Sequence, residues 1–284
     1  MSRHFGVLYC WHTMKRALVI FNPVSGHKKW RNIPILIQKT LTEKNYDWIW
    51  YETKPKQDLL ELFKNQIERG EFDRIIVSGG DGTVAEAVGA MMAMKVKTPL
   101  VILPQGSANL VAMSLGLPLF QVKRALQLGL EGKQRILDVM QVNRKYYGVI
   151  AVGRGYDAFL VQETPRDLKR KMGLFAYAWI FIKTALFYRS QPYRLSVDGK
   201  RMEVVAKSIM VFNLFPLPFL PIKPHDGVLN VLILTSKGKL IHHTGKTISI
   251  KAHKEFRFQV DGEVLKAKTI NIETLPTQLS IMAK

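Results

Sequence analysis

Residues 74–86 read RIIVSGGDGTVAE and predict a strand, a glycine-rich turn and the start of a helix. The apolar run 74–77 is typical of a buried parallel strand, and the helical pattern after the glycines continues to Met94. A turn of this kind presents backbone N–H groups and a helix N-terminus to a phosphate group. The acid within it, Asp81, would need a cation, and a magnesium ion carried by a nucleotide suits that position. The stretch therefore predicts a nucleotide site and phosphoryl-transfer chemistry.

A simpler interpretation of the same residues is a helix-capping box. In such a box the Thr83 side chain bonds a backbone amide of the first turn, and Glu86 reaches back to the cap. Capping requires no glycine pair, so this interpretation leaves Gly79 and Gly80 unexplained.

Two more strands are each followed by a turn that contains glycine and a hydroxyl group. Residues 22–26 (NPVSG) follow the apolar run 17–21, and residues 106–109 (GSAN) follow the run 99–103. Because the carboxyl ends of parallel strands meet at one edge of a sheet, we expect all three loops to line one crevice. The sequence has no G-x-x-x-x-G-K-[ST] motif, which excludes a P-loop protein.

The spacing of apolar residues changes near Leu137 and predicts a fold that is α/β followed by all-β. Before this point, strands at 17–21, 48–51, 74–77 and 99–103 alternate with helices at 34–44, 58–68, 83–94 and 107–115, which indicates a parallel sheet covered on both faces. After it, one helix at 166–188 interrupts the strands expected at 139–142, 146–152, 194–197, 202–212, 228–234, 247–252, 256–260 and 269–273. We therefore expect an α/β domain over 15–137 and an antiparallel β-sandwich over 138–284, whose last strand could return to the first domain.

The composition limits the classes of partner and the compartment. The 284 residues include 42 Lys and Arg against 22 Asp and Glu, a formal net charge of +20, which attracts nucleotides, nucleic acids or an anionic membrane. The single Cys10 excludes an internal disulfide and indicates a reducing compartment. The N-terminus shows no secretory signal, and the longest apolar run, 172–182, is too short to span a bilayer, so we expect a cytoplasmic protein.

In the second half of the sequence, Asp-Gly pairs begin at Asp198, Asp226 and Asp261, and a two-residue hairpin turn accounts for each of them. Only the last pair is followed by a second acid, Glu263, and two carboxylates so close together could supply a general base for a substrate hydroxyl. With one cysteine and no histidine spacing typical of metal ligands, a zinc site is not expected. The proline-rich segment 214–221 fits either a loop that crosses the core or the entrance for an acyl chain.

Together these motifs resemble the diacylglycerol kinase catalytic-domain superfamily, specifically the bacterial soluble lipid kinases related to sphingosine kinases. The likeness runs from about Lys15 to the end and rests on Asn22-Pro23-x-Ser25-Gly26, Gly79-Gly80-Asp81-Gly82-Thr83, Gly106-Ser107-x-Asn109 and Gly153-x-Gly155-Tyr156-Asp157-Ala158. It implies a parallel-sheet, NAD-kinase-like nucleotide domain and a β-sandwich domain that binds lipid, with the active site in the cleft between them.

The resemblance also implies roles for individual residues. Asp261 or Glu263 would accept the proton of a lipid hydroxyl, and Mg²⁺ would bind near Asp81. Asp226, helped by backbone oxygens of Lys223 and Val228, would hold a structural magnesium ion. The residues implied to contact ATP are Asn22, Pro23, Val24, Ser25, Gly26, Thr53, Gly79, Gly80, Asp81, Gly82, Thr83, Val84, Ala85 and Ser107.

Two departures from the family pattern keep alternatives open. Ala85 stands where the family commonly has Asn, and Leu110 stands where many members have Asp. An NAD kinase shares the glycine-rich loop, although residues 22–26 and the final Asp-Gly-Glu favour a lipid kinase. A catalytically inactive basic protein that binds membrane or nucleic acid is the non-enzymatic alternative, but the sequence has no nucleic-acid-binding module. The basic stretch 166–201 favours peripheral contact with an anionic membrane, and a homodimer is a further option.

Overall fold

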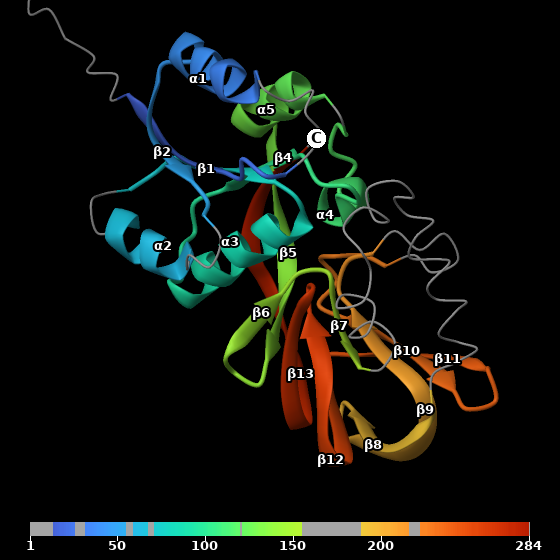
Figure 1. Ribbon diagram of the computed structural model, residues 1–284. Coiled ribbons are helices and arrows are strands. Elements are labelled where there is room, and N and C mark those ends of the chain that lie inside the picture. The colour runs from blue at the N-terminus through green and yellow to red at the C-terminus, as the bar shows by residue number, and fades with distance from the viewer. Residues whose placement is uncertain are drawn as a thin grey trace, which may run out of the picture.

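The computed structural model describes residues 14–25, 32–54, 59–67, 71–119, 121–154, 189–215 and 222–283. The strands of these segments are connected by hydrogen bonds into one thirteen-stranded sheet (Figure 1). Its parallel part is covered by helices, and its antiparallel part consists of long strands that curl around a second core.

The parallel part has the strand order β4-β3-β1-β2. Its strands are β1 (Lys15–Phe21), β2 (Tyr46–Glu52), β3 (Arg74–Gly79) and β4 (Leu100–Pro104). The helices of this part are α1 (Ile33–Glu43), α2 (Leu59–Ile67), α3 (Asp81–Ala93), α4 (Leu110–Ser114) and α5 (Val122–Glu131).

Strand β1 shows why these strands are apolar along their whole length. Leu18 and Ile20 pack into a core that they share with α2 and α3, whereas Val19 and Phe21 pack into one that includes residues of α1 and α5. Figure 1 shows α1 and α5 on one face of the sheet and α2 and α3 on the other. Because both faces are covered, side chains pointing in either direction are buried.

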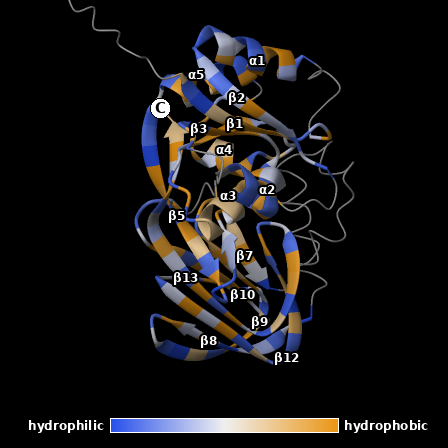
Figure 2. Ribbon diagram, turned by 90° about the vertical axis from the view of Figure 1, so that its left-hand side faces the viewer, coloured by the Kyte–Doolittle hydropathy of each residue, from blue (hydrophilic) through white to orange (hydrophobic). Residues whose placement is uncertain are grey.

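The antiparallel part follows α5. Its strands are β5 (Lys133–Val142), β6 (Tyr146–Gly148), β7 (Ala151–Arg154), β8 (Gln191–Val197), β9 (Lys200–Phe212), β10 (Leu229–Thr235), β11 (Leu240–Gly245), β12 (Thr247–Val260) and β13 (Glu263–Ala283). Both β7 and β8 pair with β9 and with β12, so these four strands close into a ring. The ring encloses a core that includes Tyr193, Ile250 and Phe258, and Figure 2 shows hydrophobic and hydrophilic residues alternating along these strands. Two separate stacked sheets are not seen among the described strands.

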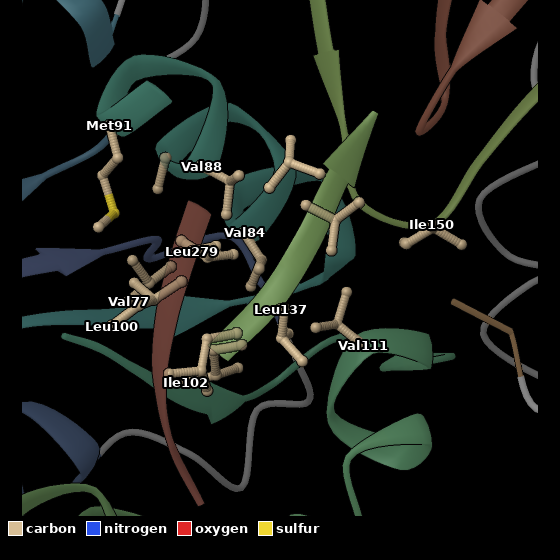
Figure 3. Close-up of a cluster of buried hydrophobic side chains, with 14 of the residues drawn as sticks. Val77, Val84, Val88, Met91, Leu100, Ile102, Val111, Leu137, Ile150 and Leu279 are labelled. Atoms are coloured by element: carbon tan, nitrogen blue, oxygen red, sulfur yellow. The ribbon is translucent and has the colours of Figure 1, made fainter. Parts of the chain in front are cut away.

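Strand β13 joins the two parts of the sheet. It pairs with β12 and β5, and Ile281 near its end pairs with Leu100 of β4. The core beneath this junction is continuous: Figure 3 shows Val77 and Ile102 of the parallel part with Leu137, Ile150 and Leu279. The expected boundary at 137/138 falls inside β5, and the division into two domains stays a prediction.

Several element predictions are confirmed and others need correction. The four parallel strands and the helices between them lie within a few residues of their expected places. The sequence pattern did not predict α5 or β11. The segments expected at 247–252 and 256–260 form the single strand β12, because a register shift between Lys251 and Phe256 interrupts the alternation without ending the strand. The single strand expected at 146–152 is instead two, β6 and β7, separated by Val149 and Ile150. The helix expected at 166–188 lies outside the described residues.

None of the described helices is long and apolar enough to cross a membrane.

Candidate active site

The three glycine-containing loops lie next to one another at the carboxyl ends of β1, β3 and β4. A Cβ atom added to Gly106 would lie 2.7 Å from the Cα atom of Gly80, so these two residues pack backbone to backbone. A Cβ atom added to Gly80 would lie 4.0 Å from Oγ of Ser25 in the first loop. Side chains at Gly80 and Gly106 would force the backbones apart, which explains glycine at both positions. The structure thus brings together the loops that were expected to share one crevice.

The first loop is tied to helix α3 by a side-chain hydrogen bond. Nδ2 of Asn22 donates to Oγ1 of Thr83 at 2.8 Å, and Oδ1 of Asn22 accepts the backbone N–H of Val24 at 3.1 Å. Pro23 and Val24 are exposed, Val24 to 81%. Asn22 therefore fixes the base of the loop, while its tip faces solvent. Gly26, the last expected residue of this loop, lies outside the described residues.

Helix α3 begins at Asp81, with Gly80 as its N-cap in extended backbone. The capping-box interpretation of Thr83 and Glu86 is therefore wrong. Thr83 lies inside the first turn, where its hydroxyl bonds Asn22 instead of capping the helix.

The residues of the first turn of α3 differ in what they offer a ligand. A Cβ atom added to Gly82 would meet nothing within 4 Å, so open space lies beside this exposed residue. Val84 is buried in the core, and Ala85 is partly buried. A ligand can thus approach the backbone most closely at Gly82.

The third loop is closed by Asn109 in a left-handed conformation, with φ of +49°. Its Nδ2 donates to the Gly106 carbonyl at 2.8 Å, and its Oδ1 accepts the Gly106 N–H at 2.7 Å. Asparagine tolerates this backbone conformation better than most residues. Helix α4 starts after it, at Leu110, later than the expected start near Ser107.

Two further residues expected to contact a nucleotide lie at the same edge of the sheet. Thr53 directly follows β2, and its N–H donates to the carbonyl of Phe21 at 2.9 Å, next to the start of the first loop. Ser107 is exposed between Gly106 and Asn109.

The Asp81 carboxylate lies against the start of α4. Its Oδ1 accepts the backbone N–H of Val111 at 3.2 Å, and the amides of Leu110 and Asn109 also contribute hydrogen bonds. Burial raises the pKa of Asp81 from its ordinary value, and these backbone hydrogen bonds oppose that rise. Asp81 therefore links the second loop to the third.

The second candidate carboxylate, Asp261, lies in the two-residue turn between β12 and β13. Its Oδ2 accepts the N–H of Val149 at 2.5 Å, and its Oδ1 accepts the N–H groups of Ile150 and Ala151 at 2.9 and 2.8 Å. Although the residue as a whole is partly exposed, its carboxylate is enclosed by protein. Burial raises the pKa of Asp261 to about 6, despite the three hydrogen bonds that lower it.

Asp261 lies near helix α3, although 180 positions separate it from Asp81 in the sequence. Helix α3 packs against β6, and a Cβ atom added to Gly148 at the end of β6 would lie 3.5 Å from Oδ1 of Asp261. The negative charge of Asp81 accordingly contributes to the raised pKa of Asp261. Glu263, the other acid of the turn, is exposed at the first residue of β13.

The residues expected to hold a structural magnesium ion lie in the segment before β10. Asp226 is exposed, and its Oδ1 accepts the N–H of Val228 at 3.0 Å. Residues 222–228 contain no strand, so Asp226 and Gly227 do not form a two-residue hairpin turn, which corrects the simplest interpretation of that pair. Within the described ranges, no cluster of three or more His, Cys, Asp or Glu side chains is placed to bind a metal. Ligation of Mg²⁺ by Asp226 and the backbone oxygens of Lys223 and Val228 stays a prediction.

One buried acid near this segment was missed by the sequence analysis. Asp138 of β5 is 1% exposed, its Oδ2 accepts the N–H of Gly227 at 2.7 Å, and its own N–H donates to the carbonyl of Pro224 at 2.9 Å. A single acid within the apolar run 136–140 was the available signal, because buried acids are rare unless they are bonded.

Comparison with known proteins shows which family the chain resembles. Residues 16–142 match the family model of the diacylglycerol kinase catalytic domain. The chain is 30% identical over 187 residues to the diacylglycerol kinase of Bacillus subtilis, a match covering 66% of this chain and 61% of that enzyme. It is 27% identical over 291 residues to the diacylglycerol kinase of Staphylococcus aureus strain MRSA252, covering 91% and 90% of the two chains.

These matches support the diacylglycerol kinase catalytic-domain superfamily as the family that this chain resembles. A crystal structure from this superfamily, that of a Bacillus anthracis protein proposed to be a diacylglycerol kinase, has the same fold with a TM-score of 0.81. The two proteins are 23% identical, and the superposition covers 95% of each chain. Of the superfamily motif that starts at Gly153, only the first two residues are described; Gly155, Tyr156, Asp157 and Ala158 lie outside the described residues.

Proposed function

We propose that this protein is an ATP- and Mg²⁺-dependent lipid kinase that transfers the γ-phosphoryl group of ATP to a lipid hydroxyl. Diacylglycerol, a sphingoid base and phosphatidylglycerol are the candidate acceptors. The main support is that the Asp261 carboxylate lies beside Gly148 of β6, a strand that packs against helix α3, so that the charge of Asp81 raises the pKa of Asp261. This proximity brings a candidate base to the loops that are suited to hold phosphates.

The nucleotide would bind across the three loops. Exposed backbone at Gly82 and the N-terminus of α3 suit a phosphate group, because backbone N–H groups and the helix dipole favour negative charge. Ser25 and Ser107 add hydroxyl groups on either side. Positioning and electrostatic stabilisation are the main requirements of phosphoryl transfer.

The donor set fits a magnesium ion that arrives with the nucleotide. Such an ion takes one or two protein carboxylates and completes its shell with water and phosphate oxygens. Asp81 is the carboxylate that would hold such an ion, and the positive charge of the ion would favour the ionised form that burial disfavours. When bound there, Mg²⁺ would neutralise phosphate charge.

Asp261 suits the role of base better than Glu263. Two described N–H groups bond Oδ1 and one bonds Oδ2, and since a carboxylate oxygen has two lone pairs, Oδ2 is the atom that would accept the substrate hydroxyl. A pKa of about 6 keeps the carboxylate ionised at neutral pH while leaving it basic enough to take a proton. Glu263 is exposed to solvent.

A lipid acceptor implies contact with a membrane surface. The exposed side chains Arg189, Lys200 and Arg201 belong to the basic stretch identified in the sequence, and Arg194 pairs with Glu203 at 3.1 Å. Each basic residue near an anionic bilayer contributes about 1 kcal/mol. We propose peripheral attachment from the cytoplasmic side.

The decisive experiment is phosphorylation of a total lipid extract with labelled ATP, followed by identification of the product by mass. A labelled lipid that requires Mg²⁺ supports the proposal, and the matched control is the Asp261→Asn variant. A parallel reaction with NAD tests the rival kinase. A product from NAD and none from lipid would overturn the proposal.

A further inference from the structure

The backbone that supports the Asp261 carboxylate is fixed on its other side as well. The amide cradle, Val149–Ala151, directs its three N–H groups at Asp261. Its carbonyl groups are also bonded. The Val149 carbonyl accepts Nδ2 of Asn213 at 2.9 Å, and the Ile150 carbonyl accepts the backbone N–H of Asn213 at 3.0 Å. One residue thus holds two of the three peptide groups in the cradle.

Asn213 also connects the cradle to the rest of the sheet. Its Nδ2 donates a second hydrogen bond, at 2.9 Å, to the carbonyl of Asp138 in β5. Val149 and Ile150 lie in the gap between β6 and β7, where the regular ladder of the sheet is interrupted. Backbone groups in such a gap need other partners, and Asn213 supplies them.

Burial of the Asn213 side chain lowers the stability of the fold. The residue is 1% exposed, and its Oδ1 is buried without a hydrogen-bond partner in the described part of the structure. A buried acceptor without a hydrogen-bond partner lowers stability. Leucine would fill a similar volume without this penalty, but it could not donate to the two carbonyl groups.

We infer that Asn213 is a positioning residue for Asp261, because it orients the three N–H groups that hold this carboxylate. Well-aligned N–H donors stabilise the ionised form of a carboxylate, and misaligned donors leave it harder to ionise. The kinetic part of this inference rests on the proposed kinase function. The geometric part can be measured without any turnover.

The direct test is the titration of the Asp261 carboxyl carbon by NMR in the full-length chain. In Asn213→Ala the pKa of Asp261 should rise by about one unit, since the donors lose their alignment. Asn213→Ser keeps one hydroxyl donor and should raise the pKa of Asp261 by less. This variant replaces Asn213→Ala in the test if the alanine variant does not fold. The control is Asn230→Ala. Asn230 is 7% exposed, it lies one strand beyond the Phe212–Ala151 pair, and its Oδ1 bonds Nε2 of His242 at 3.0 Å.

The expected result is a shift in both Asn213 variants and none in Asn230→Ala. An unchanged pKa of Asp261 in both Asn213 variants would overturn the inference, whatever the enzyme's activity. Failure of the kinase proposal alone would leave the titration result intact, so the two can fail separately.

The kinetic test follows kcat against pH once a lipid acceptor is identified. In Asn213→Ala the acidic side of the profile of kcat against pH should move by about one unit to higher pH. The value of kcat should therefore be about tenfold lower than in the wild type below pH 6, and the difference should shrink above pH 8. The KM for ATP should change less than about twofold, because no nucleotide loop is touched. A residue that merely stabilises the fold would reduce kcat by the same factor at every pH, and that outcome would count against a positioning role.

Discussion

Two Asp-Gly turns of this protein share their local structure but differ in chemistry. Asp198-Gly199 joins β8 to β9, and Asp261-Gly262 joins β12 to β13; both aspartates have φ of +47°, and both glycines also have positive φ. Each carboxylate accepts backbone N–H groups from a segment distant in the sequence, which for Asp198 are those of Lys246 and Thr247. Yet the pKa of Asp198 lies below its ordinary value, whereas that of Asp261 is raised to about 6.

The difference comes from the surroundings of the turns. Hydrogen bonds from Thr247 and Lys246 dominate at the exposed Asp198 and favour its ionised form. At Asp261 burial outweighs similar bonds, and the negative charge of Asp81 adds to it. Two turns with the same residues and a similar backbone thus differ in role: Asp198 holds the local structure together, whereas Asp261 is a candidate base.

The largest expected effect is a difference in kcat between variants of the two turns. Asp261→Asn should lower kcat by about 10²–10⁴-fold, the contribution typical of a general base. Asp198→Asn should leave kcat within about twofold, because the turn between β8 and β9 only fixes local structure. Steady-state lipid phosphorylation with both variants measures this. An equal decrease of kcat in both variants would mean that Asp261, like Asp198, only stabilises local structure.

The next effect tests the electrostatic link that distinguishes Asp261. Asp81→Asn keeps an oxygen for the N–H of Val111 but removes the charge, so the fold should persist. We expect kcat to fall by about 100-fold or more, since a preorganised electrostatic group is lost. The pKa of Asp261 should fall as well, because a like charge no longer opposes its ionisation. Carboxyl titration by NMR checks this shift, with Asp198 as the internal reference that should not move.

A smaller effect concerns the pH dependence of the free energy of unfolding, to which the two turns should contribute in opposite directions. The pKa of Asp261 is raised from 3.8 to about 6 in the folded state. As the pH rises from 3.8 to about 6, this carboxyl ionises in the unfolded chain before it does in the folded protein, so the free energy of unfolding decreases. The decline is at most ~3 kcal/mol, as ~1.4 kcal/mol corresponds to one unit. Asp198 has a lowered pKa, so its contribution is present above the unfolded value and is lost as the pH falls below it.

Urea unfolding of the wild type, Asp261→Asn and Asp198→Asn at pH 4.5 and 7.5 tests these signs. Between the two pH values the wild type should lose stability relative to Asp261→Asn. A gain instead would show that the three N–H bonds outweigh burial.

The smallest effect uses the glycines of the two turns. Gly199 and Gly262 have φ of +81° and +100°, and a Cβ atom on either would meet nothing within 4 Å. Alanine at either position should therefore cost about 1 kcal/mol through backbone strain alone. Only Gly262→Ala should also lower kcat, by less than about tenfold, because it shifts the turn that carries Asp261. If Gly199→Ala lowered kcat as much, the two turns would not differ in function.

The parallel part of the fold was largely predictable from the sequence. Runs such as 17–21 and 74–77 are apolar throughout because helices cover both faces of the sheet, and this burial leaves an unambiguous local pattern. The glycines at 80 and 106 were also recognisable as sites of close approach, although the sequence did not show that they pack against each other.

The antiparallel part was less predictable because its strands depart from regular alternation. Val149 and Ile150 look like the middle of a strand, but their N–H groups bond Asp261 instead of continuing a ladder. Strand β13 runs past Pro276 and changes partners along its length, from β12 to β5 and at Ile281 to β4. Neither feature leaves a periodic signal, since each depends on contacts more than 100 positions away.

The sequence by itself determined the four parallel strands with the helices between them, the three glycine-bearing loops and the Asp-Gly pairs of the antiparallel part, because each follows from local backbone preferences and apolar spacing. The tertiary structure alone decided which pair faces the loops, and so which aspartate has a raised pKa. Burial and the charge of a distant residue set that pKa, and both exist only after the chain has folded.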